Sequence, residues 1–243
     1  MLKLVQLDLY DVKKDDVECH IFMQDEAISK SKEIVGVDVE ELQGVLSAVA
    51  NLVKAKIAKY NSTIGVARWG DVVEHFMRNL SSLPNFEYVK EYGQPRIYNR
   101  EKNIQFIVMT ANSGLGNVDE LLKPKSEKGG MTQKCIDNNP LDYLDKTALR
   151  TFILYIPSLG NEQYRSKNSL SIPIEIAYPI GYSVRETKDG KIKVIPNKYG
   201  CRIIHFIDTE ALSQSMKFKD KPDFTPTEEI TEDSFELNLK FIG

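Results

Sequence analysis

The chain has 243 residues, of which 42% are hydrophobic and 28% are charged, and its formal net charge is −3. These values are typical of a globular protein. They exclude a chain disordered throughout and a protein that coats nucleic acid through bulk positive charge. The three cysteines, an odd number at wide spacing, indicate free thiols rather than a disulfide framework. Neither a signal-peptide core nor a run of 18 apolar residues occurs, so we expect a cytoplasmic protein with no membrane partner.

The N-terminal third is predicted to contain one strand followed by two helices. Residues 3–10 alternate between apolar and polar side chains, which predicts a half-buried strand. Asp38 and Glu41 then have the spacing of a capping box, and the apolar residues after them recur every three or four positions. This pattern predicts an amphipathic helix over 38–60, and a similar apolar stripe predicts a second helix over 69–80.

The remaining two thirds of the chain favour strands. We expect strands at 86–90, 96–98, 103–110, 149–156, 171–178, 181–187, 192–195, 202–208 and 235–241. The sequence Lys-Asp-Gly-Lys at 188–191 is typical of a hairpin turn between two of them. Short helices are expected near 117–122, 141–145 and 209–217.

Helices and strands do not alternate along the chain, which argues against a doubly wound parallel sheet. We therefore predict an α+β fold, in which a mostly antiparallel sheet is covered on one face by the two amphipathic helices of the N-terminal third. The whole chain, 1–243, is expected to form a single domain. It would carry a long irregular insertion at 111–148 and a flexible linker at 218–234.

A glycine-containing turn follows the most apolar strand and is the first candidate ligand site. Backbone amides of Gly114, Gly116 and Asn117 could face an anion at the start of a helix. The third glycine of a dinucleotide fingerprint and the lysine of a phosphate-binding P-loop are both absent. Four lysines with one intervening acid come next: Lys123, Lys125, Lys128 and Lys134.

Lysines on a long loop can neutralise phosphates. The leading hypothesis is therefore a binding protein that contacts a phosphate-bearing ligand or nucleic acid through residues 111–134, with no cofactor. The simpler alternative is a flexible turn followed by a solvated insertion that has no ligand.

A second hypothesis is a metal-dependent hydrolase, such as a nuclease. Glu186-Thr187-Lys188 has the acid-x-lysine spacing in which carboxylates hold Mg²⁺ and the lysine steadies the attacking water. Two other matches occur in the chain, and about three are expected by chance. Glu175, among apolar residues of an expected strand, could supply a further carboxylate, although strand alternation favours a position in solvent. Mg²⁺ is implied only under this hypothesis, and no metal site is predicted otherwise.

A third hypothesis is a structural subunit that is held to a protein partner by edge strands near the termini. The residues leave open whether the chain is an enzyme.

Overall fold

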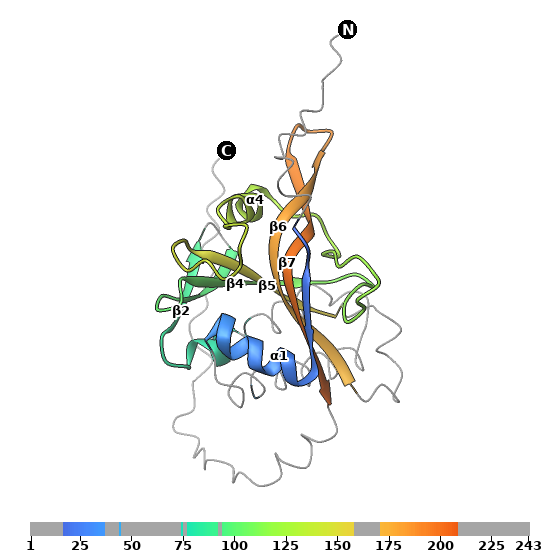
Figure 1. The fold of residues 1–243 in the computed structure, drawn as a ribbon. Helices are drawn as coiled ribbons and strands as arrows, with labels where there is room; N and C mark the ends of the chain where they lie inside the picture. Colours follow the sequence, from blue (N-terminus) through green and yellow to red (C-terminus); the bar gives the residue numbers. More distant parts are fainter. Residues whose placement is uncertain are drawn as a thin grey trace, which may run out of the picture.

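The structure, a computed structural model, describes residues 17–36, 77–91, 94–157 and 171–208, together with Gly44 and Glu74. Within these ranges seven strands form one sheet (Figure 1). The strands are β1 (His20–Met23), β2 (Phe86–Glu91), β3 (Gln94–Asn99), β4 (Ile104–Thr110), β5 (Arg150–Ile156), β6 (Ser171–Glu186) and β7 (Ile192–Asp208). The helical elements are α1 (Gln24–Lys30), the π-helical turn η2 (Ser31–Val35) and α4 (Gly130–Asp137).

The sheet is mixed, with the order β1–β7–β6–β5–β4–β3–β2. The pairs β1–β7 and β4–β5 are parallel, and the other four neighbouring pairs are antiparallel. The prediction of a mostly antiparallel sheet covered on one face by two N-terminal helices was wrong, because the sheet is mixed and the helical elements α1, η2 and α4 have only 7, 5 and 8 residues. The connection between β4 and β5 contains α4 and returns the chain parallel to β4, as a crossover does. The sequence of this connection predicts an irregular insertion because α4 carries few apolar side chains.

Several expected elements lie wholly or mostly outside the described residues. The helices expected at 38–60 and 69–80 are described only at Gly44, Glu74 and 77–81, all of which are helical. The expected strands 3–10 and 235–241, the helix 209–217 and the linker 218–234 all fall outside. The short helices expected near 117–122 and 141–145 were wrong, because these residues form turns and bends.

Strands β6 and β7 form a long antiparallel hairpin that extends past α4 at the top of Figure 1. Each of them joins two strands that the sequence pattern separates. The register shifts between Tyr178 and Tyr182, where Pro179 and Gly181 interrupt the pattern. The expected turn at 188–191 is confirmed, and its Gly190 has a φ of +74°.

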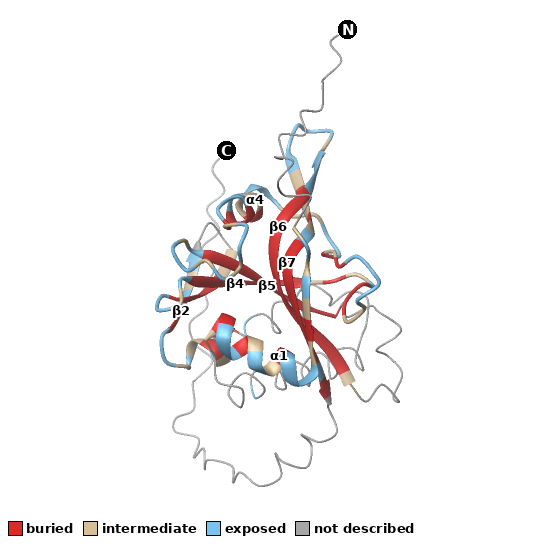
Figure 2. Ribbon diagram, viewed as in Figure 1, coloured by how far each residue is buried: buried red, intermediate tan, exposed pale blue. Residues whose placement is uncertain are grey.

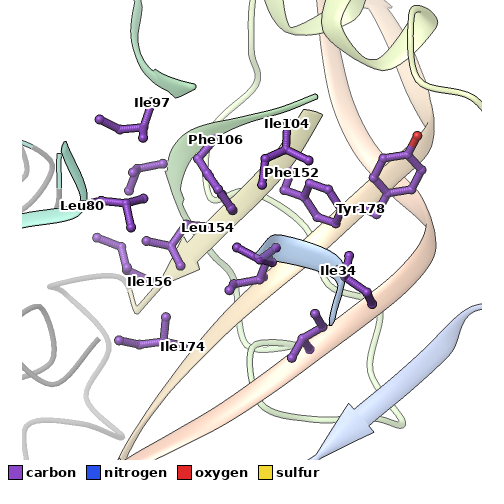
Figure 3. Close-up of a cluster of buried hydrophobic side chains, with 14 of the residues drawn as sticks. Ile34, Leu80, Ile97, Ile104, Phe106, Phe152, Leu154, Ile156, Ile174 and Tyr178 are labelled. Carbon is purple, nitrogen blue, oxygen red and sulfur yellow. The ribbon is translucent and has the colours of Figure 1, made fainter. Parts of the chain in front are cut away.

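The central strands β4, β5 and β6 are buried on both faces over most of their length (Figure 2). On one face, aromatic and aliphatic side chains of these strands pack against η2 (Figure 3). Members of this cluster that Figure 3 labels include Ile34, Ile104, Phe106, Phe152 and Leu154. On the other face, alternate residues of β4 and β5 pack against the 111–122 segment through Leu115 and Leu122. In the described part of the chain no helix has the length and hydropathy needed to span a bilayer.

Candidate functional site

A buried ion pair lies beneath the glycine turn, on the face of the sheet that the 111–122 segment covers. Glu175 of β6 is 0% exposed and Arg202 of β7 is 4% exposed. The guanidinium binds the carboxylate through two hydrogen bonds of 2.9 Å, from Nε to Oε2 and from Nη2 to Oε1. The expectation that Glu175 faces solvent was therefore wrong, since β6 is covered on both faces at this point.

The same ion pair fastens the glycine turn to the sheet. The backbone amide of Gly116 donates a hydrogen bond to Oε1 of Glu175. Arg202 Nη2 donates to the carbonyl oxygens of Gly114 and Asn117 at 3.0 and 3.1 Å. The anion bound by this turn is therefore Glu175 of the chain itself. The Gly116 amide and the carbonyl groups of Gly114 and Asn117 already have hydrogen-bond partners within the fold.

Both glycines are required by packing. Gly116 has a φ of +76°, and a Cβ atom there would lie 2.7 Å from Cβ of Pro173. A Cβ atom at Gly114 would lie 2.6 Å from the carbonyl oxygen of Leu121. Without a side chain, Gly114 packs closely against the backbone of Leu121, and Gly116 lets the turn approach β6 closely enough to reach Glu175.

Opposing effects act on the ionisation of Glu175. Burial raises the pKa of Glu175 above its ordinary value, because the charged form loses water. The Arg202 guanidinium and the Gly116 amide oppose this rise by stabilising the carboxylate. The carboxylate therefore depends on these two partners to carry its charge inside the fold.

A hollow of about 400 Å³ opens beside this pair, between β1, β7 and residues 118–122. Its lining includes Cys19, Asp119, Glu120, Lys198 and Arg202. Burial raises the pKa of the Cys19 thiol to about 11, so the thiol is protonated and a poor nucleophile at neutral pH. The guanidinium of Arg202 is committed to Glu175 and to backbone carbonyls, and two acids line the same hollow. The hollow is therefore poorly suited to an external anion.

The residues of the hydrolase hypothesis are not brought together. Glu175 and Glu186 lie on the same strand, eleven residues apart, which corresponds to about 35 Å at about 3.3 Å per residue. Lys188 follows Glu186 in the exposed hairpin turn. Within the described ranges, no three His, Cys, Asp or Glu side chains converge in a way that could hold a metal ion.

The four candidate lysines lie along a segment that is hydrogen-bonded to the rest of the fold. The backbone amide of Lys123 donates to the Asn112 side chain, and that of Lys125 donates to a carbonyl oxygen of β4. Lys134 is exposed on α4. Lys128 is half-buried, and burial lowers its pKa.

Lys128 joins its segment to the β6–β7 hairpin. Its backbone amide and carbonyl exchange two hydrogen bonds of 2.9 Å with Val194 of β7. One residue earlier, the Glu127 carboxylate accepts a 2.7 Å hydrogen bond from the Arg185 guanidinium of β6. Residues 123–128 are therefore held beside the hairpin, although more than fifty residues separate the two segments in sequence.

This contact concentrates positive charge on one part of the molecule. Residues 123–137 and 182–198, together called the basic surface below, contain nine lysines or arginines and four acids, a net charge of +5. The chain as a whole has a net charge of −3, so its other residues carry −8. The ligand site predicted from the sequence covers residues 111–134 and does not include the basic residues of the hairpin. The signal available was four basic residues between 185 and 193.

No family model, curated protein or solved structure matches this chain. The arrangement of its own side chains is therefore the basis for a functional proposal.

Proposed function

We propose that this chain binds nucleic acid through the basic surface, with the hairpin as the main contact. The observation that carries the proposal is the pairing of Lys128 with Val194, which joins two basic segments into one surface. A chain with a net negative charge needs a local cluster of positive charge to bind a polyanion. In this protein the fold gathers positive charge on the basic surface.

The charged groups of the hairpin are accessible to phosphates. Arg185, Lys188 and Lys191 are exposed, and Lys193 is partly exposed. Two of these groups have acidic partners in the fold, Glu127 for Arg185 and Asp189 for Lys191. Ion pairs between exposed groups contribute little to stability, so these cations can exchange a carboxylate for a phosphate at small cost.

The proposal includes a cytoplasmic location. Cys135 and Cys201 are buried, and neither they nor Cys19 form a disulfide bond. Cysteines without disulfide bonds suit a reducing compartment.

The test compares two variants that lose the same charge. The first replaces Lys188, Lys191 and Lys193 with glutamine. The matched control replaces three exposed lysines outside the basic surface, Lys32, Lys90 and Lys146, in the same way. Binding to a fluorescein-labelled oligonucleotide is followed by anisotropy at several salt concentrations.

The hairpin variant should lose at least about ten-fold in affinity. Its slope of log affinity against log salt should become shallower by about 2 to 3, close to 0.9 for each lost phosphate contact. The control should keep the slope of the wild-type protein. The proposal is wrong if both variants behave alike, or if the wild-type protein shows no salt-dependent binding.

A further inference from the structure

Resting on that proposed function, we infer that the tip of the β6–β7 hairpin enters the major groove of a B-form DNA duplex. The tip, residues 183–195, projects beyond the body of the sheet and is mostly exposed (Figure 2). Its last three residue pairs are Val184↔Val194, Arg185↔Lys193 and Glu186↔Ile192, followed by the turn.

The dimensions of the tip fit the groove. Neighbouring strands lie about 4.8 Å apart, and the two pair steps beyond Val194 add about 7 Å of ribbon before the turn. The major groove of B-form DNA is about 12 Å wide and about 8.5 Å deep, and it admits a two-stranded ribbon. The contact at Lys128 supports the base of the tip, which leaves the part beyond it available to the groove.

The two faces of the tip differ in chemistry. Because side chains alternate along each strand, the paired residues Arg185 and Lys193 share one face. Val184 and Ile192 lie on the opposite face and are 48% and 51% exposed. Exposed aliphatic side chains beside a net positive charge suit a groove, in which cations reach phosphates and methyl groups contact thymine methyls.

Glu186 lies on the aliphatic face, opposite Ile192. A carboxylate on a nucleic-acid-binding surface would repel phosphates. On the groove side of the tip it faces base edges instead, where the cytosine amino group is a donor that glutamate can accept.

The composition of the basic surface argues for a duplex rather than a single strand. The one aromatic residue of the basic surface, Tyr182, is 8% exposed and donates a hydrogen bond to Asp137. Single-strand binding relies on aromatic side chains on which successive bases stack, and none is available here. An RNA duplex is also disfavoured, because its major groove is too deep and narrow for side chains to reach the base edges.

Three oligonucleotides of one sequence test the inference: a DNA duplex, an RNA duplex and a single DNA strand. Anisotropy titrations with the wild-type protein should show the DNA duplex bound at least about ten-fold more tightly than either of the others. In the double variant Val184→Ser/Ile192→Ser, affinity for the DNA duplex should fall about ten-fold with an unchanged salt slope, because no phosphate contact is lost. Affinity for the other two ligands should not change, which also shows that the variant is folded.

The control is Tyr88→Ser, which removes another exposed apolar side chain, on β2 at the far end of the sheet. It should bind like the wild-type protein. Equal affinity for the three ligands, or an unaffected double variant, overturns the groove inference while the lysine variants can still support nucleic-acid binding. Absence of binding to all three ligands overturns both proposals.

Discussion

Replacing Glu175 with glutamine tests the structural role of the buried ion pair most sharply. Glutamine has nearly the same shape but no charge, so it leaves the Arg202 guanidinium charged at 4% exposure. Breaking a buried pair by removing one partner costs about 3 to 5 kcal/mol of unfolding free energy. Arg202 keeps its hydrogen bonds to the carbonyls of Gly114 and Asn117, so we expect the lower end of that range, about 3 kcal/mol.

The reverse change, Arg202→Met, should cost more, about 5 kcal/mol. It leaves the Glu175 carboxylate with only the Gly116 amide, and it removes the donor from the two carbonyls of the turn. Each single change leaves one buried charge without its partner, and the double variant removes both charges. Its loss of unfolding free energy should therefore be at least about 2 kcal/mol smaller than the sum of the two single losses.

Urea unfolding followed by tryptophan fluorescence and circular dichroism measures these values. The unfolding midpoint should fall by about 1 M for Glu175→Gln, with an unchanged dependence on denaturant concentration. A loss below about 1 kcal/mol, or additive single losses, would refute the role assigned to the pair.

Three further changes probe other parts of the fold, each by its effect on the free energy of unfolding. Gly116→Ala should cost about 3 kcal/mol, because Gly116 has a positive φ and lies in close contact with β6. Gly190→Ala should cost only about 1 kcal/mol, because Gly190 has a similar φ but lies in open space. Equal losses for the two variants would contradict the packing argument. Burial lowers the pKa of His205, whose Nε2 lies 3.0 Å from Oγ of Ser31, from 6.5 to about 4. As the pH falls from about 6.5 to 4, His205 is protonated in the unfolded chain but stays neutral in the folded protein, so the free energy of unfolding should drop by up to about 3 kcal/mol. In His205→Gln the dependence of this free energy on pH should be weaker. Asn139→Ala should cost about 3 kcal/mol, since its buried side chain makes three hydrogen bonds to the backbone of β5 and β6, and a loss under about 1 kcal/mol would argue against them.

The strands were the most predictable part of this fold. The apolar run that became β4 and the Asp-Gly turn of the β6–β7 hairpin both have strong local patterns, and both are present. Helix α4 was missed because its buried face, Thr132, Cys135 and Ile136, spans a single turn and includes a polar threonine, which is too short a stripe to predict a helix. Because α4 was not predicted, the connection between β4 and β5 was not identified as a crossover, and their parallel pairing was not predicted either.

The candidate site was harder to predict because it depends on strand register. Strand alternation placed Glu175 in solvent on the assumption that one face of β6 is open. Its partner Arg202 lies 27 residues away, and the register of a bulged hairpin decides whether the two meet. The basic surface likewise depends on the contact of Lys128 with Val194, which no local pattern encodes.

Hydrogen–deuterium exchange with and without a short DNA duplex tests nucleic-acid binding by the basic surface most directly. If the basic surface binds DNA, amide exchange should slow within residues 183–195 and 123–137 when the duplex is present and should stay unchanged in β2 and β3. Unchanged exchange throughout the hairpin, or protection confined to another part of the chain, would contradict it.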